Sequence, residues 1–240
     1  MPTTVTVQTQ PVYGLPRPSG VVIFRRVVQS LPGLVAYWRC NEASGTTLTD
    51  TMQGDVLTLA GSGTSLGAAG ATPDGGPPLA AAFNGSGWAT TAGMGNLPSG
   101  SAARTFALFF KSSSGALNTM FSYGAGNECS LIVNYPATGN ACLYNGTAYG
   151  VGSGLNDGLW HLFIITYDGA ILTRYIDTLT NSSSTGGVSL ATSAGNRGIG
   201  RDIAQSGYPM VGSVDEVCVW NRALSQADVL RLMTAGAVRN

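Results

Sequence analysis

Short apolar runs alternate with clusters of Gly, Ser, Asn and Pro along most of this chain. Runs of this kind, rich in β-branched and aromatic residues and bounded by turn formers, are typical of β-strands. The stretch from Trp160 to Tyr167 is apolar at odd and even positions alike, which predicts a central strand covered on both faces. The pattern predicts strands at 34–38, 56–59, 79–83, 105–110, 119–123, 131–135, 141–144, 159–167, 171–176, 188–190, 198–200 and 210–220. So many short strands, punctuated by 34 glycines, favour an all-β antiparallel sandwich or jelly roll.

The last predicted strand leads into a short helix. Ser225 fits the N-cap position and Asp228 follows three residues later. Leu224 and Val229 can form a hydrophobic staple across this start, and Gly236 supplies a stop. We therefore expect one short helix at the C-terminal end of the sandwich.

Residues 1–32 differ from the rest, because they hold five prolines and show no helical periodicity. They predict an extended N-terminal arm, followed by a single domain over residues 33–240. The arm contains a compact apolar run without a partner in its own segment: Val21, Val22, Ile23 and Phe24. We expect this run to dock onto neighbouring protein subunits.

The composition of the chain argues against several classes of function. Hydrophobic residues make up 44% and charged residues 10% of the chain, so a sizeable core is expected and disorder driven by charge is excluded. The 12 basic and 12 acidic side chains cancel, and no basic cluster exceeds Arg25-Arg26, which argues against a nucleic-acid partner. The first residues lack a signal-peptide pattern and no window suits a membrane span, so we expect cytoplasmic synthesis without export by the general route.

A set of short motifs follows one another along the chain: LVAYWRCNEASG (34–45), FNG (83–85), GLWH (158–161), TYD (166–168), YID (175–177), GIG (198–200) and GSVDEVCVWNRALS (212–225). In order and spacing they resemble the successive motifs of the concanavalin A-like, laminin G-like jelly-roll family. The resemblance spans residues 33 to about 235 and implies an antiparallel β-sandwich. It departs from the family at Thr178, where members often have Gly, and in lacking a second histidine after His161.

The four cysteines lack CxxC spacing, which excludes a zinc site or redox pair of that type. They are Cys40, Cys129, Cys142 and Cys218. Cytoplasmic synthesis favours free buried thiols. In this fold class the first and last strands are usually neighbours, so Cys40 could instead face Cys218.

Catalytic patterns are missing from the sequence. Retaining glucanases on this general sandwich need two carboxylates that face one cleft about 5 Å apart. Here Asp215 and Glu216 are adjacent and should point to opposite faces, while no other run holds acids at alternate positions. His161, the only histidine, is expected to be a packing residue at a strand entrance. We therefore predict no catalytic residues and no enzyme activity.

The family resemblance implies a structural Ca²⁺ between the loop after the first strand and the last strand. The matching oxygen donors are Glu42, Asp50 and Asp215, with Asn41 as a further candidate. The alternative for Glu42 and Asp215 is capping of turns and pairing with Arg39 or Arg222. Glycan binding would need aromatic rings beside hydroxyl and amide groups. Trp88, Tyr123, Tyr149 and Tyr208 fit that chemistry, and each could equally close the core at its rim.

Two functions follow as hypotheses. In the first, the chain is a structural or decoration protein of a large particle such as a bacteriophage virion. Its jelly roll then faces outward from the particle surface, and its arm joins copies into a homo-oligomer or lattice. In the second, it is a carbohydrate-binding or adhesion module that recognises cell-surface glycans. The Pro-rich arm, the missing export signal and the low charge favour the first.

Overall fold

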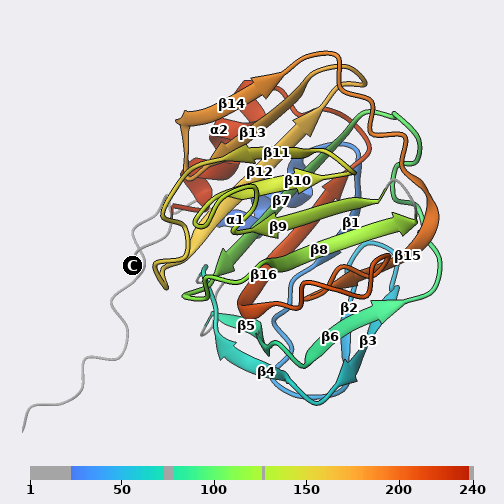
Figure 1. Ribbon diagram of the computed structural model, residues 1–240, viewed down its shortest axis with the longest axis vertical. Helices are drawn as coiled ribbons and strands as arrows, with labels where there is room; N and C mark the ends of the chain where they lie inside the picture. The colour runs from blue at the N-terminus through green and yellow to red at the C-terminus, as the bar shows by residue number, and fades with distance from the viewer. Residues whose placement is uncertain (1–22, 73–77, 126–127, 238–240) are drawn as a thin grey trace, which may run out of the picture.

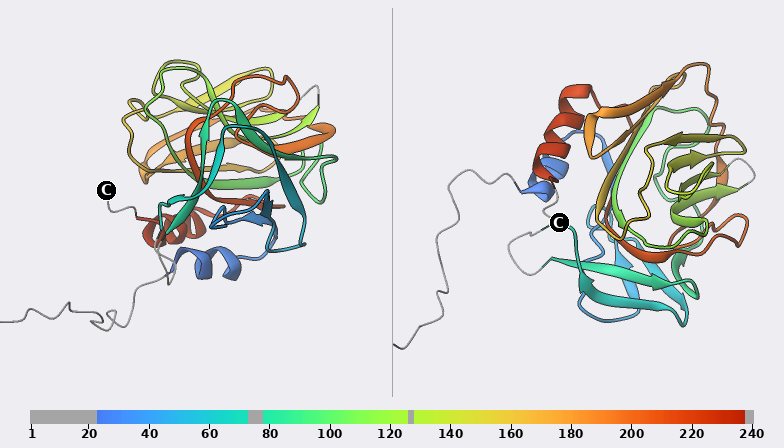
Figure 2. Two further views of the ribbon diagram at one scale, coloured as in Figure 1. Left: turned by 90° about the horizontal axis from the view of Figure 1, so that it is seen from below. Right: turned by 60° about the vertical axis from the view of Figure 1, so that its left-hand side comes forward.

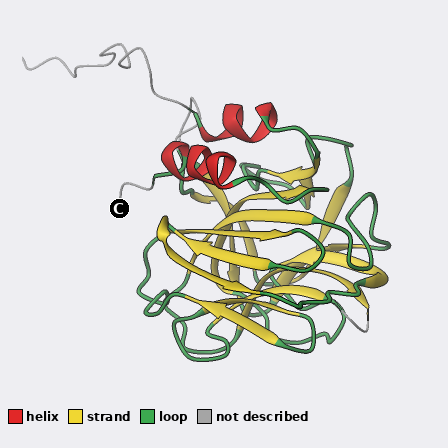
Figure 3. Ribbon diagram, turned by 90° about the horizontal axis from the view of Figure 1, so that it is seen from above, coloured by secondary structure: helices red, strands yellow, loops and turns green. Residues whose placement is uncertain are grey.

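The computed structural model describes residues 23–72, 78–125 and 128–237. It shows two antiparallel sheets packed face to face, with two helices on the outer face of one sheet. Figure 1 shows one sheet in front of the other, and Figures 2 and 3 show both helices together on one side of the sandwich. The all-β sandwich expected from the apolar pattern is confirmed.

Both sheets have eight strands. Sheet A follows the order β14 (Thr178–Thr185), β13 (Leu172–Ile176), β12 (His161–Tyr167), β7 (Arg104–Lys111), β16 (Val211–Trp220), β5 (Leu79–Asn84) and β4 (Thr64–Ala69), with β1 (Leu34–Trp38) also paired to β16. Sheet B follows the order β11 (Ala148–Val151), β10 (Ala141–Tyr144), β9 (Cys129–Val133), β8 (Asn118–Ala125), β15 (Ser193–Ile199), β6 (Gly87–Thr91), β3 (Val56–Gly61) and β2 (Thr47–Thr49).

The strand predictions hold for the apolar runs and fail for polar or small ones. Strands β4 and β14 went unpredicted because Thr, Ser, Gly and Ala carry little apolar signal, and both lie at edges of sheet A. The predicted strand at 188–190 is wrong, because this segment is a loop. Its Val188 and Leu190 are nevertheless buried in the core between the sheets, which explains the apolar pattern.

Sheet A is buried on both faces, as the sequence around β12 predicts. Phe163 and Ile165 point into the core between the two sheets. Leu162 and Ile164 point the other way, into a second core beneath the helices. This alternation places one strand in two separate hydrophobic cores.

The second core is closed by α1 (Phe24–Ser30) and α2 (Gln226–Ala235). Phe24 is 2% exposed, and its ring meets that of Phe109 on β7 edge to face with centroids 5.0 Å apart. Gly236 ends α2 at a close approach, because a Cβ there would lie 2.8 Å from the Phe109 ring. The predicted C-terminal helix is confirmed, and the Ser225 hydroxyl accepts a hydrogen bond from the Asp228 amide.

The prediction of an extended arm over residues 1–32 is wrong where the structure describes it. Residues 24–30 form α1, because an apolar stripe with helical spacing needs a face to cover. The stripe consists of Phe24, Val27, Val28 and Leu31, with polar residues between. Ile23 is half-buried at the start of the helix, whereas Val21 and Val22 lie outside the described residues. Phe24 therefore belongs to the core of its own domain.

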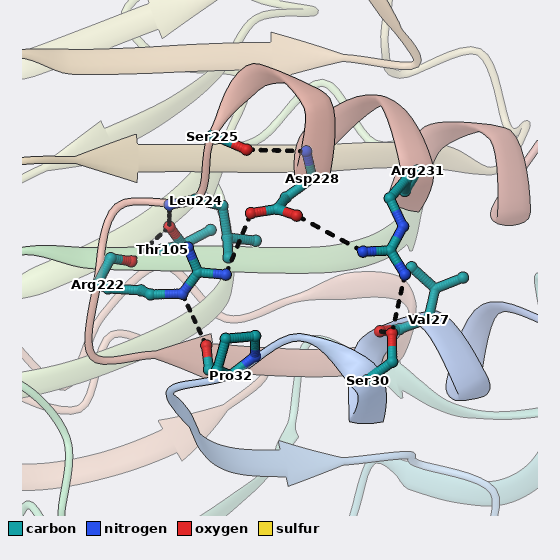
Figure 4. A network of polar contacts seen from close by, with 9 residues as sticks. All are labelled: Val27, Ser30, Pro32, Thr105, Arg222, Leu224, Ser225, Asp228 and Arg231. Atoms are coloured by element: carbon teal, nitrogen blue, oxygen red, sulfur yellow. Dashed lines mark hydrogen bonds and ion pairs between the residues drawn. The ribbon is translucent and has the colours of Figure 1, made fainter.

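A polar network ties the two helices together (Figure 4). Arg222, just after β16, donates through Nε to the carbonyl of Pro32 at 2.7 Å and through Nη2 to Oδ2 of Asp228 at 3.1 Å. Arg231 pairs with Oδ1 of Asp228 at 3.7 Å and donates to Oγ of Ser30 at 3.1 Å. Asp228 thus links the chain leaving β16 to both helices.

The packing predicts that α1 contributes to stability. Phe24→Ala should lower the free energy of unfolding by about 3–5 kcal/mol, because it empties part of the second core. Arg26→Ala, on the exposed side of the same helix, is the control and should change it by less than about 0.5 kcal/mol. Urea unfolding of the two variants measures the difference. Equal effects would show that α1 is only loosely attached.

Candidate functional site

A surface pocket lies on the outer face of sheet B. It has a cavity volume of ≈ 50 Å³ and is lined by Leu117, Ile132, Tyr135, Tyr144 and Tyr208. We call it the tyrosine pocket. The rings of Tyr135 and Tyr144 meet edge to face, with centroids 5.7 Å apart. An apolar floor with several phenol groups suits a ligand that has both C–H faces and hydroxyl groups.

Strand alternation explains how these side chains reach the outer face. Leu131 and Val133 of β9 belong to the core between the sheets, so Ile132 between them points outward. Tyr144 of β10 likewise follows Leu143, which belongs to that core. Tyr135 and Tyr144 were not among the predicted glycan contacts, although each ends one of the predicted strands at 131–135 and 141–144. The sequence signal for Tyr144 was its place next to the apolar Leu143, because neighbouring side chains in a strand point to opposite faces of the sheet.

Tyr208 comes from the loop between β15 and β16, which crosses the outer face of sheet B. Ser122 on β8 holds this loop, donating through Oγ to the Arg201 carbonyl and accepting from the Ile203 amide, both at 2.9 Å. The Thr119 amide donates to the carbonyl of Tyr208 at 2.8 Å. Tyr208 has φ of 50°, a left-handed backbone conformation that is costly for a bulky residue. The anchored loop therefore holds this ring in place.

Two buried carboxylates fix the same loop. Asp202 is 0% exposed and accepts from Oγ of Ser130 and from the Gln205 amide, both at 2.9 Å. Glu128 is 4% exposed and accepts from the side-chain amide of Gln205. Burial and the charge of Glu128 raise the pKa of Asp202, although its hydrogen bonds act in the opposite direction. Both carboxylates are occupied in holding the loop.

The other predicted glycan contacts have different positions. Tyr123 is 0% exposed: its hydroxyl accepts from Nη1 of the buried Arg104 at 2.6 Å and donates to the Pro98 carbonyl at 3.0 Å. The prediction that Tyr123 contacts a glycan is wrong, because its ring fills the core. Trp88 is half-buried on β6 with the Arg201 guanidinium 4.2 Å from its ring centroid. Tyr149 packs against the core beside Arg174.

A second group of polar residues lies where β1 meets β16. The Tyr37 hydroxyl donates to Oε2 of Glu216, and Oδ2 of Asp215 accepts from the Ala71 amide at 2.9 Å. Cys40 and Glu216 both have φ of 53°, and the pairing of β16 with β7 shifts between Asp215 and Cys218. All four cysteines are free and buried, as the sequence favoured. Burial, then Asp215, Glu42 and Glu216, raise the pKa of the Cys40 thiol.

His161 lies at the start of β12 between two carboxylates. Its Nδ1 is 2.8 Å from Oδ2 of Asp177 and its Nε2 is 3.2 Å from Oδ1 of Asp157. Burial lowers the pKa of His161, but the hydrogen bonds and charges of Asp177 and Asp157 outweigh burial and raise it above 6.5. Such an arrangement links β12 to the β13–β14 turn.

Comparison with known proteins assigns the fold family. A family model described as the concanavalin A-like lectin/glucanases superfamily matches residues 83–230, more than half of the chain. The chain belongs to this superfamily. No curated protein matches the sequence.

Solved structures of this superfamily fold include carbohydrate-active proteins. Domain 4 of AbnA, a GH43 extracellular arabinanase from Geobacillus stearothermophilus in complex with arabinotriose, has a TM-score of 0.62 and 19% identity, covering 83% of this chain and 98% of that chain. Trypanosoma rangeli sialidase in complex with sialic acid has a TM-score of 0.57 and 14% identity, covering 85% of this chain and 33% of that chain. At these identities the similarity shows a shared fold.

Two of the three residues predicted to bind Ca²⁺, Glu42 and Asp215, each have one oxygen that no described residue satisfies. Oε2 of Glu42 and Oδ1 of Asp215 are buried and have no hydrogen-bond partner within the described residues. Asp50 fits poorly, because its Oδ1 accepts from the amides of Tyr37 at 2.7 Å and Met52 at 2.9 Å. Glu42 and Asp215 also cap turns through their other oxygens, as the alternative proposed.

The described residues contain no group of three or more His, Cys, Asp or Glu side chains placed to hold a metal. Ca²⁺ takes about six to eight oxygens, so backbone or water oxygens would have to complete a site at Glu42 and Asp215. The calcium site therefore stays a prediction.

A calcium titration tests this site. If Ca²⁺ binds, it should raise the melting temperature of the wild type and EDTA should lower it. Ligand at about 100 times Kd adds about 2.7 kcal/mol. Glu42→Gln and Asp215→Asn should abolish the response. Asp50→Asn is the control: its amide oxygen can still accept from Tyr37 and Met52, and the calcium response should stay. A wild type indifferent to both Ca²⁺ and EDTA would leave turn capping as the role of these carboxylates.

His161 predicts a pH dependence of stability. Its raised pKa means that the folded state holds the proton more tightly than the unfolded state. The stabilisation is fully present below about pH 6.5 and is lost as pH rises through the folded pKa. His161→Gln should remove this part of the profile. Melting temperatures of both proteins from pH 5 to 9 measure it, and parallel profiles would contradict the assignment.

Proposed function

We propose that this chain is a carbohydrate-binding module whose tyrosine pocket contacts glycans. The pocket is the observation that carries the proposal: it combines aromatic faces with phenol hydroxyls on the outer face of sheet B. Membership of a lectin/glucanase superfamily and the fold shared with an arabinotriose-bound domain support it. The proposed site of action is extracellular, on the glycans of a cell surface.

Binding without hydrolysis is the preferred form of this function. Of the acidic residues beside the pocket, Glu128 and Asp202 are almost fully buried, and their oxygens hold Ser130 and Gln205. A glycosidase needs one carboxyl group that can protonate a leaving group and another that reaches the sugar or a water. Carboxylates occupied in holding a loop do not offer that geometry, so we propose that the chain is not an enzyme.

The particle hypothesis, a decoration protein of a virion or similar lattice, now has weaker support. Its expected docking element was the apolar run at the end of the arm, and Phe24 of that run packs into the core of its own domain. The pocket instead favours glycan binding, which is compatible with display on a particle. Docking to neighbouring subunits through residues 1–22 stays a prediction outside the described residues. None of the described helices is long and apolar enough to span a membrane.

Alanine variants of the pocket test the proposal. A shallow site that binds at about 1 mM gives about 4 kcal/mol, and losing about 1.4 kcal/mol reduces affinity tenfold. We expect Tyr144→Ala and Tyr208→Ala each to reduce the affinity for a bound oligosaccharide by about tenfold or more. A glycan array identifies the oligosaccharide and calorimetry measures the affinity.

Trp88→Ala provides the control, because Trp88 lies on β6 of the same sheet and does not line the tyrosine pocket. It should leave affinity unchanged. Loss of binding in this variant alone would move the site to Trp88, as the sequence first suggested. Release of reducing sugar by the wild type would contradict the proposal that the chain is not an enzyme.

A further inference from the structure

The side chains that line the tyrosine pocket are all uncharged. Three are tyrosines and two, Leu117 and Ile132, are aliphatic. The chain as a whole has a formal net charge of zero, so no long-range field of one sign attracts a charged ligand. Selection for or against a charged glycan must therefore come from the charges next to the pocket.

The charges next to the pocket are negative. Asp202 accepts from Oγ of Ser130 at 2.9 Å, and Ser130 on β9 is paired in register with Tyr144 on β10, which lines the pocket. Burial raises the pKa of Tyr144, and the neighbouring Tyr135, Glu128, Tyr208 and Asp202 raise it further. Both carboxylates lie beneath the loop that carries Tyr208, joined through the backbone and side chain of Gln205. Because both are buried, salt screens their field less than it would screen surface charges.

Two arginines, Arg201 in the loop that carries Tyr208 and Arg174 on β13, are directed away from the pocket. Arg201, in the same loop, stacks over Trp88 at 4.2 Å and donates to the carbonyl of Ser206. Arg174 is 3% exposed at the sandwich edge, where it donates to Thr185 and Ser183 of β14, both at 2.8 Å. Neither lines the pocket. A carboxylate-bearing sugar there would meet two negative charges without a lining cation.

We infer that Glu128 and Asp202 make the tyrosine pocket selective for neutral glycans over anionic ones such as sialylated or uronic-acid oligosaccharides. This inference rests on the proposed glycan binding at the same pocket. It assigns the two carboxylates a second effect besides anchoring the loop: they set the sign of the electrostatic potential that a ligand meets.

An array of matched neutral and acidic glycans makes the first test. The full chain should bind neutral members and should bind their uronic-acid or sialylated counterparts at least about tenfold more weakly. For quantitative work, the best neutral oligosaccharide is compared by calorimetry with its carboxylated counterpart of equal length. The methyl ester of that counterpart, which restores neutrality with the same sugar ring, should recover most of the affinity.

Charge-removing variants make the second test. Glu128→Gln and Asp202→Asn keep atoms that can accept from Gln205, and each should narrow the neutral-to-acidic affinity ratio at least about threefold. Because both carboxylates also anchor the loop that carries Tyr208, a loosened loop would weaken neutral and acidic glycans alike, so the affinity ratio is the readout. Asp168→Asn removes the same charge from an exposed turn after β12, so it is the matched control and should leave the ratio unchanged.

The outcomes separate the two proposals. Equal or tighter binding of the acidic glycans, or an unchanged ratio in both variants, overturns the selectivity and leaves glycan binding standing. Binding of no glycan of either kind overturns the proposed function and the selectivity with it. A neutral preference that is lost in Glu128→Gln or Asp202→Asn and kept in Asp168→Asn supports both.

Discussion

Coverage of both faces of sheet A is the constraint on which the rest of the structure depends. Strands β12, β7 and β16 carry apolar side chains on both faces, so a sandwich of two sheets would leave one of these faces in water. At about 25 cal/mol per Å² of apolar surface, an open face of that size would be strongly destabilising. Helices α1 and α2 cover it, which explains why Phe24 and Val27 belong to the fold.

The outer face of sheet B is only partly covered, unlike that of sheet A. Its cover is a loop held by Ser122, Asp202 and Gln205, and beside the loop the surface opens into the tyrosine pocket. A loop held by polar contacts can position an aromatic ring and still leave part of the sheet face open to solvent. A helix packed on an apolar face covers that face. The domain thus has one face built for stability and another that is available to a ligand.

Buried charge is handled differently at the two polar centres of the molecule. Beneath the loop, Glu128 and Asp202 each find hydrogen-bond donors, which offset the cost of removing a carboxylate from water. At the junction of β1 and β16, one oxygen each of Glu42 and Asp215 stays without a partner within the described residues. The first centre satisfies its carboxylates with protein hydrogen bonds, whereas the second leaves two carboxylate oxygens that no described residue satisfies.

Local sequence determined much of this fold. The apolar runs predicted the central strands, Ser225 and Gly236 predicted the limits of α2, and the alternation of β12 predicted burial on both faces. Helix α1 was not predicted, because the prolines before it suggested an extended arm and the helical spacing of Phe24, Val27, Val28 and Leu31 was overlooked. These features depend on neighbours a few residues apart, where pattern and backbone geometry are directly linked.

Tertiary structure alone decided the candidate site. Tyr135, Tyr144 and Tyr208 come from two strand ends and a distant loop, and Glu128 meets Asp202 only because that loop crosses β8 and β9. Tyr123 looked equally suitable in sequence, but strand alternation directs its ring into the core, where its hydroxyl accepts a hydrogen bond from Arg104. A sequence shows which residues have the right chemistry, whereas register and loop path determine which of them share one face, because both are set by long-range packing.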